Sequence, residues 1–210
     1  MTYRELITLL KNTENPEELQ ARRDEIASLI PAVRQMFDFE HRNGYHMYDV
    51  WTHSLYVVTY LPKGVDDDML YLAALLHDIG KPSAAAYSGK PGDDELHYKG
   101  HQILGKEIDK NKVLPELLKS ADISENDRER LLYYVEHHDD VVVPTVHNIR
   151  KQYRRVPLET FKKLLLLEIA DSKAHVMKPL IVERLENCTA LYDGLAEQIY
   201  KKIENEKNAD

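Results

Sequence analysis

Apolar residues recur at three- and four-residue steps along most of the chain, which is the spacing of amphipathic helices. One such stripe runs from Met69 to Leu76, and another follows the segment 179–208. Only residues 96–98 and 141–143 resemble strands, and both stretches are too short to build a sheet. The pattern predicts an all-α fold.

Helix start signals divide the chain into segments of helical length. Asn15-Pro16 combines an N-cap residue with proline at the first helical position, and predicts a helix that runs toward Ile30. The acidic triplet Asp66–Asp68 predicts a second start, and Ser124, with an acidic residue three positions later, predicts a third. The last amphipathic segment predicts one closing helix over 179–208. No internal repeat or flexible linker interrupts these segments, so we expect a single domain over 1–210.

Composition narrows the class of protein further. The 210 residues are 43% hydrophobic and 30% charged, with a net charge of -8 and an isoelectric point near 5.7. This balance is ordinary for a soluble domain, and it argues against a general nucleic-acid or membrane-surface binder. The single cysteine, Cys188, excludes an intramolecular disulfide. Without a secretion signal or a long apolar run at the N-terminus, we expect a cytoplasmic protein with no membrane partner.

Several histidines and aspartates lie on the apolar stripes of their own segments, where such side chains are costly to bury. These positions come from five segments: His53, His77-Asp78, His101, His138 and Asp171. A shared metal ion would remove the cost. A lone inward histidine is more often a hydrogen-bonded core residue, so spacing alone leaves both interpretations open. Imidazoles and carboxylates without thiolates suit Mn, Fe, Co, Ni, Zn or Mg.

The order of these residues resembles the signature of the HD-domain metal-dependent phosphohydrolase superfamily. The motifs are Tyr45-His46-Met47-Tyr48-Asp49-Val50-Trp51-Thr52-His53, Leu75-Leu76-His77-Asp78-Ile79-Gly80-Lys81-Pro82, His97-Tyr98-Lys99-Gly100-His101, Glu136-His137-His138-Asp139 and Ile169-Ala170-Asp171. They are most similar to the HD domain attached to bacterial tRNA nucleotidyltransferases and poly(A) polymerases. The resemblance covers about residues 45–175, with helices in 1–44 and 179–208 expected to pack on that core. Because no nucleotidyltransferase motif precedes residue 45, we expect a free-standing HD domain without polymerisation activity.

The resemblance implies a helical bundle and a metal-ligand set. His53, His77, Asp78 and Asp171 are expected to hold one divalent ion. His101 and His138 correspond to the additional ligands of relatives with two ions, and Asp78 then bridges both. Two such ions can activate a water to attack a phosphate ester. Lys81, directly after the metal-binding turn, is expected to contact the substrate phosphate, although a solvent-exposed lysine is the alternative.

Three further residues match the same motifs with alternatives left open. His46 is interpreted as a proton donor to the leaving oxygen or as a structural partner of a ligand imidazole. Asp49 is interpreted as orienting His53 or, preferably, as the N-cap of its helix. His137 competes with its neighbour His138 for the second ligand position, which the motif frame assigns to His138.

Basic residues concentrate between positions 150 and 163, close in sequence to Asp171. Arg150 and Arg154 are candidates for binding a substrate phosphate, although a solvated helix face is the commoner explanation. Four histidines receive no functional assignment and are expected on the surface or in core packing: His41, His97, His147 and His175.

The function expected from the sequence is hydrolysis of a phosphate ester of a nucleotide, a cyclic nucleotide or another small molecule, with two divalent ions as cofactors. One alternative enzyme is a phosphodiesterase on RNA ends, such as a 2',3'-cyclic phosphate, which arginines lining the cleft would favour. A non-catalytic ligand-sensing domain is the other alternative. The sequence leaves the metal, the substrate and the oligomeric state open.

Overall fold

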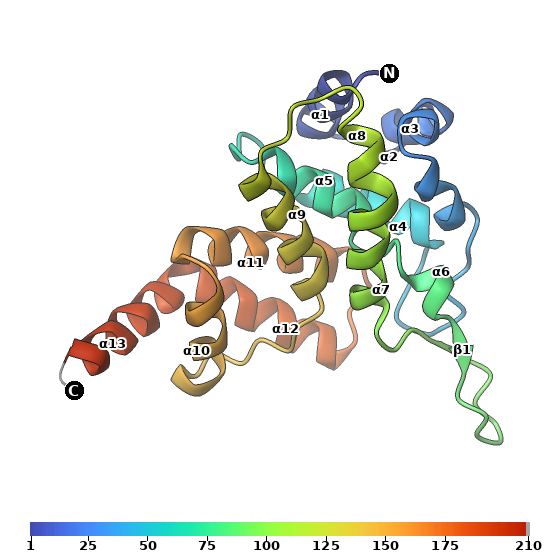
Figure 1. Cartoon of the computed structure of the whole chain (residues 1–210). Helices are drawn as coiled ribbons and strands as arrows, with labels where there is room; N and C mark the ends of the chain where they lie inside the picture. The colour runs from blue at the N-terminus through green and yellow to red at the C-terminus, as the bar shows by residue number, and fades with distance from the viewer. Residues whose placement is uncertain (209–210) are drawn as a thin grey trace.

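The computed structural model describes residues 1–208 and confirms the all-α prediction (Figure 1). Two short strands occur within residues 1–208, β1 (Ala86–Tyr87) and β2 (Leu96–His97). They form an antiparallel pair at the base of a hairpin that projects from the molecule. Of the two strand-like stretches in the sequence, only 96–98 contributes to it. Across residues 1–208, no helix is both long and apolar enough to cross a membrane.

The N-terminal segment forms short helices at one end of the molecule. These are α1 (Tyr3–Asn12), α2 (Pro16–Gln20), α3 (Arg23–Leu29) and the 3-10 helix η1 (Pro31–Met36). The predicted start at Asn15-Pro16 is confirmed, because the Asn15 side chain accepts a hydrogen bond from the backbone of Glu17. The predicted continuous helix toward Ile30 is wrong, since Arg22 leaves the helical conformation and separates α2 from α3.

Four helices pack around the main core: α4 (Val50–Tyr60), α5 (Asp68–Leu76), α9 (Glu125–His137) and α11 (Leu158–Lys173). Helix α5 is apolar on all sides, and every residue from Met69 to Leu76 is buried, which is typical of a central helix. Asp67 caps α5 and also accepts a hydrogen bond from Tyr134 of α9. The predicted helix starts at the acidic triplet and at Ser124 are therefore confirmed. The N-cap residue of α5 also links this helix to α9 by a hydrogen bond.

A close backbone contact joins the end of α5 to the next layer. After Asp78 the chain turns through Gly80 into α6 (Lys81–Ala84), which packs on α7 (His101–Ile108). A Cβ atom at Gly80 would lie 2.0 Å from the carbonyl oxygen of His101, so only glycine permits this approach. The turn after Asp78 is thereby held directly against the first residue of α7.

The C-terminal part adds a second layer of helices. Helix α10 (Val146–Arg155) follows α9, and α12 (Pro179–Ala190) runs along α11 (Figure 1). The prediction of one helix over 179–208 is wrong. At Gly194, whose φ is 136°, the π-helical turn η3 (Leu191–Leu195) redirects the chain into α13 (Ala196–Asn208), which packs against α10.

A buried carboxyl without partners lies at the end of α7. Asp109 opens the π-helical turn η2 (Asp109–Val113), which leads into the short helix α8 (Leu114–Leu117). Its side chain is 0% exposed and neither carboxyl oxygen has a hydrogen-bond partner. Burial raises the pKa of Asp109 well above its ordinary value. Folding therefore favours the protonated acid, and the free energy of unfolding decreases as pH rises above about 4, the range in which the unfolded carboxyl ionises.

Replacing Asp109 with asparagine is expected to stabilise the protein at neutral pH by a few kcal/mol, because the buried carboxyl must bind a proton on folding, at a cost of about 1.4 kcal/mol for each pH unit above its unfolded pKa, whereas asparagine is neutral. The gain is expected to grow between pH 5 and pH 8, because asparagine does not ionise. Urea unfolding of both proteins at several pH values measures the difference. Equal stability of the two proteins at every pH would contradict this explanation.

Candidate metal centre

Six residues predicted as metal ligands meet at one place although they come from five helical segments. His53 lies in the middle of α4, and Asp171 lies on the facing side of α11. His77 and Asp78 follow the end of α5, His101 begins α7, and His138 directly follows the end of α9. All six side chains are buried. The fold thus brings together the set that the sequence suggested.

Four potential metal-ligand atoms, two imidazole nitrogens and two carboxylate oxygens, form a first group. His53 Nε2 is 2.9 Å from Asp171 Oδ1 and 3.6 Å from Asp78 Oδ2. His77 Nε2 lies 3.3 Å from both His53 Nε2 and Asp78 Oδ2, and 3.5 Å from Asp171 Oδ1. Such separations suit ligands about 2.0–2.2 Å from a shared ion. These residues match the predicted first metal site.

A second group uses the other oxygen of Asp78. His101 Nε2 and His138 Nε2 are 3.1 Å apart, and they lie 3.4 and 3.6 Å from Asp78 Oδ1. Asp78 therefore directs Oδ2 toward the first group and Oδ1 toward the second. This is the arrangement expected of a carboxylate that bridges two ions.

The hydrogen bonds of the imidazoles fit bound cations. The Nδ1 atoms of His77, His101 and His138 lie 2.8–3.0 Å from the backbone carbonyl oxygens of Ala74, Tyr98 and Val135, and they donate protons to them. Each neutral ring then presents a lone pair at Nε2, so the facing Nε2 atoms repel each other unless a cation or a proton lies between them. The donor chemistry therefore fits divalent metal ions.

The pKa values of the ligands show that the cluster attracts positive charge. Burial would raise the pKa of Asp78, but the charges of Lys81 and His77 hold it well below its usual range. Burial alone would lower the pKa of His77, but Asp78 and Asp171 raise it to about 10. Burial lowers the pKa of His53 to about 3. In the absence of metal, the cluster retains a proton that a bound cation would displace.

A pocket of about 340 Å³ opens onto this cluster. Asp78, His101, His138 and Asp171 contribute to its lining. The remaining lining combines aromatic and aliphatic side chains with cationic ones and one further carboxylate, and includes Tyr45, Tyr98, Leu180, Ile181, Lys81, Lys99, Arg184 and Asp139. A small molecule that carries both a phosphate and an apolar group suits such a lining.

Lys81 and His46 both line the pocket, but they contact each other. Lys81 Nζ is 2.7 Å from Asp78 Oδ2 and 3.0 Å from His46 Nε2. The other ring nitrogen of His46 donates to Asn43 Oδ1, which also accepts the backbone N–H of Tyr45. In this arrangement His46 directs no proton toward the pocket, which favours its structural interpretation.

Arg184 of α12 is a site residue that our sequence analysis missed. Its Nη1 is 2.9 Å from Asp171 Oδ2, and its Nη2 donates to the carbonyl oxygen of His138. The Arg184 guanidinium therefore connects Asp171, a ligand of the first group, to the C-terminal end of α9, where His138 of the second group lies. The sequence contains a signal for it, because Arg184 lies on the same helical face as the buried Ile181 and Cys188.

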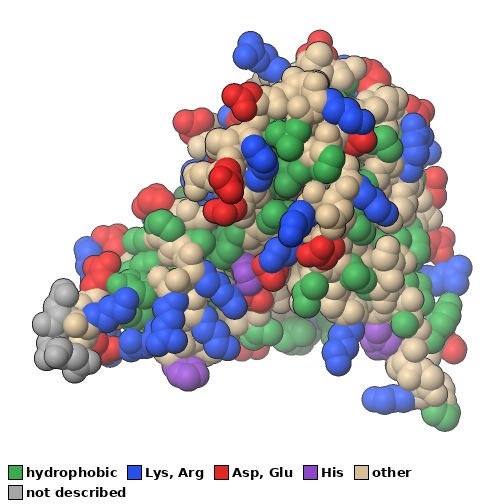
Figure 2. Space-filling model, in the orientation of Figure 1, with side chains coloured by type: hydrophobic (Ala, Val, Ile, Leu, Met, Phe, Trp, Pro, Cys, Tyr) green, Lys and Arg blue, Asp and Glu red, His purple; other side chains and the backbone are tan. Residues whose placement is uncertain are grey.

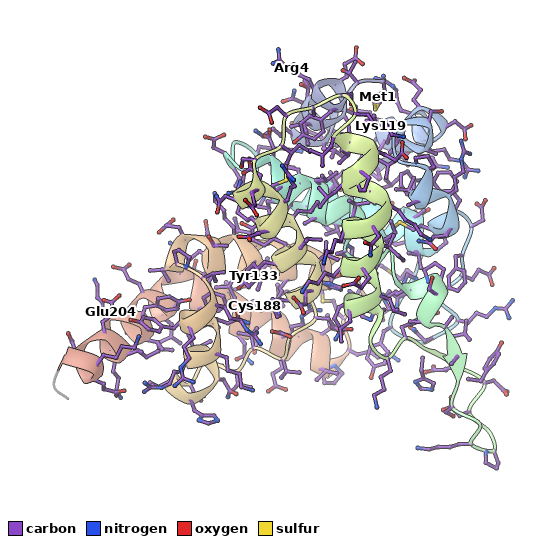
Figure 3. The ribbon with its side chains drawn as sticks, viewed as in Figure 1. Met1, Arg4, Lys119, Tyr133, Cys188 and Glu204 are labelled. Atoms are coloured by element: carbon purple, nitrogen blue, oxygen red, sulfur yellow. The ribbon has the colours of Figure 1, made fainter. Side chains whose placement is uncertain are left out.

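Glu168 extends this network into the interior. Its carboxylate is 3.7 Å from Arg184 and accepts a hydrogen bond from the Cys188 thiol, labelled in Figure 3. Burial raises the pKa of Glu168 to about 8, although the charge of Arg184 opposes the shift. Cys188 has its expected core position and also hydrogen-bonds with this buried acid.

Two histidines that received no assignment lie beside the cluster. His175 lines the pocket, and its Nδ1 donates to the carbonyl oxygen of Asp171. His41 stacks on His46 with ring centroids 3.6 Å apart. Burial lowers the pKa of His41, which favours its neutral form. Both are buried, one of the two places expected for them, and both lie against the predicted ligands.

The lower-ranked candidates lie outside the two groups. His137 is paired with Asp140, 3.0 Å from its Nδ1, and belongs to neither group. Asp49 is the N-cap of α4, because its carboxylate accepts the backbone N–H of Thr52 at 2.9 Å. This is the interpretation that the sequence favoured.

The basic residues near position 150 are not brought to the pocket. Figure 2 shows Lys and Arg side chains gathered over α10, beside α13. Arg150 forms an ion pair of 2.5 Å with Glu206 of α13, and Arg154 lines a separate cavity with Tyr200. Closeness in sequence to Asp171 does not bring them close in space, because α10 packs on α13.

Replacing His101 with alanine is expected to lower the number of tightly bound divalent ions by one, because His101 belongs only to the second group. Metal analysis of the desalted protein measures the ratio of metal to chain. The exposed His97, paired with Asp93 in the hairpin, gives a matched control that should keep the wild-type ratio. An unchanged ratio in His101→Ala would mean that the second group does not bind an ion.

Comparisons with known proteins agree with this geometry. A family model described as HD domain matches residues 43–174, a segment that contains all six proposed ligands. A comparison with curated proteins finds no match.

Proposed function

Because this chain belongs to the HD domain family, we propose that it is a metal-dependent phosphohydrolase for a phosphate ester of a nucleotide, a cyclic nucleotide or another small molecule. One observation carries the proposal. Asp78 directs one carboxylate oxygen to His53, His77 and Asp171, and the other to His101 and His138. A divided carboxylate of this kind suits two ions that share a ligand.

The six ligands would hold the metal at the floor of the pocket. When bound, divalent ions supply positive charge for the phosphate oxygens and lower the pKa of a water molecule. The backbone carbonyls that accept from His77, His101 and His138 fix the rings with Nε2 toward the ions. The chain thus contributes a rigid cradle whose lone pairs are oriented before metal binds.

Other residues of the pocket would bind the substrate. Lys99 provides positive charge near the metal ligands and suits an oxygen of the phosphate group, whereas Arg184 is engaged with Asp171 and the carbonyl oxygen of His138. Tyr45, Leu180 and Ile181 give the pocket apolar surface, which suits the remaining part of a small ester. This combination supports a phosphate ester with an apolar or aromatic group over inorganic anions.

Metal-dependent phosphate-ester hydrolysis is the activity suggested by membership of the HD domain family. The closer resemblance to the HD domain of tRNA nucleotidyltransferases stays a prediction. The alternative substrate, an RNA end with a 2',3'-cyclic phosphate, depended on arginines near position 150. Arg150 is paired with Glu206 of α13 and Arg154 lines a separate cavity, so no observation favours this alternative. A non-catalytic sensing domain is the remaining alternative.

Metal analysis and a substrate panel together test the proposal. The protein is purified without added ions, and its metal content is measured before and after chelation. Nucleoside monophosphates, 2',3'- and 3',5'-cyclic nucleotides and p-nitrophenyl esters are then assayed with Mn²⁺, Co²⁺, Ni²⁺, Zn²⁺ or Mg²⁺. We expect turnover that disappears on chelation. Bound metal without turnover on any ester would favour the sensing domain, and absence of metal binding would refute the metal centre.

A further inference from the structure

Lys81 is unusually placed for a lysine. Its side chain is only 7% exposed, although it carries a charge that is costly to bury without partners. Its Nζ atom lies 2.7 Å from Asp78 Oδ2, the oxygen that belongs to the first group of metal ligands. The ammonium group therefore lies inside the metal centre and next to its bridging carboxylate.

Two histidine lone pairs complete the surroundings of this ammonium. His41 donates from Nδ1 to the carbonyl oxygen of Tyr48, and His46 donates from Nδ1 to Asn43 Oδ1. Both rings consequently present a lone pair at Nε2. These two Nε2 atoms lie 3.2 and 3.0 Å from Lys81 Nζ. The ammonium group thus donates to His41 and His46 and forms an ion pair with Asp78.

The side chains of His41, His46 and Asp78 form the same kind of ligand set as the two metal groups. His41 Nε2 is 3.9 Å from Asp78 Oδ2, and one ligand atom from each of His41, His46 and Asp78 lies within 4.8 Å of the others. Two neutral imidazoles and one carboxylate also make up the second group, of His101, His138 and Asp78. Such a set is well suited to a divalent ion. Here the lysine occupies its centre.

We propose that His41, His46 and Asp78 form a third cation position of this centre, and that the Lys81 ammonium occupies it in place of a metal ion. Lys81 is then a positioning residue, which holds Asp78 Oδ2 and prevents a further divalent ion from binding. This role replaces the contact with substrate phosphate expected from the sequence. The inference rests on the proposed metal centre, since it assigns Lys81 a place within it.

Removing the ammonium should open the position to metal. The Lys81→Ala variant and the wild-type protein are each saturated with Mn²⁺, desalted and analysed for metal per chain by native mass spectrometry and elemental analysis. We expect one additional Mn²⁺ per chain in Lys81→Ala. The double variant Lys81→Ala/His41→Ala should return to the wild-type number, because it lacks one of the three ligands.

Lys99→Ala is the matched control, since Lys99 lines the same pocket but has no bond to these histidines. We expect it to keep the wild-type number of ions. An identical number of ions in Lys81→Ala and the wild type would overturn the third cation position. If the wild type bound no metal, the proposed function would fail, but the difference between variant and wild type would still decide the present inference.

A second measurement does not require the Lys81→Ala variant to fold, because it is made on the wild type and uses only the conservative Lys81→Arg variant for assignment. In protein labelled with ¹⁵N-lysine, a buried ammonium that donates to two imidazoles beside a carboxylate exchanges its protons slowly and gives an observable side-chain resonance. We expect one such resonance in the wild type, assigned through its loss in Lys81→Arg. Absence of any protected lysine ammonium would overturn the proposal.

Discussion

The Asp78→Asn variant is expected to lose tightly bound metal and to hydrolyse the best substrate about a thousandfold more slowly, or not at all. Asparagine keeps the shape of the side chain but removes the charge that both groups of ligands share. The lost stabilisation of the transition state by bound ions amounts to several kcal/mol, and about 4 kcal/mol corresponds to a thousandfold. No other carboxylate reaches His101 and His138 in the described residues.

Metal per chain and kcat/KM measured on the same preparation test this expectation. Asp109→Asn is a matched control, because it neutralises another fully buried aspartate that lies outside the metal groups. This control should retain the wild-type metal content. Full metal content in Asp78→Asn would refute the bridging role, and loss of turnover at that metal content would restrict Asp78 to the chemical step.

The second large effect is expected from Arg184→Ala, which should lower the free energy of unfolding by about 3–5 kcal/mol. The guanidinium lies between Asp171 and Glu168, both buried carboxyls, and it also donates to the carbonyl of His138. Alanine would leave these acceptors without their partner in a poorly hydrated interior. Breaking a buried pair in this way costs much more than the pair itself contributes.

Urea unfolding in the presence of chelator separates this effect from metal binding. Arg150→Ala provides the comparison, because Arg150 pairs with Glu206 at the surface and an exposed pair contributes at most about 1 kcal/mol. A loss in Arg184→Ala no larger than that in Arg150→Ala would show that Asp171 and Glu168 do not depend on the guanidinium.

Local signals in the sequence account for the helix starts but not for the changes of direction. Asn15, Asp67 and Ser124 act on backbone groups two or three residues away, so their capping can be recognised without tertiary structure. The end of α12 is different. Its apolar spacing continues past Gly194, and only packing of α13 against α10 requires the turn there.

The metal ligands were identifiable because each interrupts an apolar stripe with a side chain that is costly to bury, and because their order resembles the HD-domain signature, which decided between a core role and a metal site. His41 gave no such signal, because it lies in the irregular segment between η1 and α4, where no periodic pattern marks an inward face. Its role depends on contacts with Lys81 and His46. The prediction that Arg150 and Arg154 bind the substrate relied on their closeness in sequence to Asp171. Separation along the chain says little about distance across a folded molecule.

The position of Arg184 also indicates which part of the chain is needed to form the complete pocket. The family match stops at residue 174, whereas Leu180, Ile181 and Arg184 form part of the pocket lining. A fragment cut at the limits of the match would retain every proposed ligand yet lack this side of the pocket. Recombinant design and domain transplantation should therefore include α12, and two members with equal ligand sets can differ in the substrates they accept through the helix that follows.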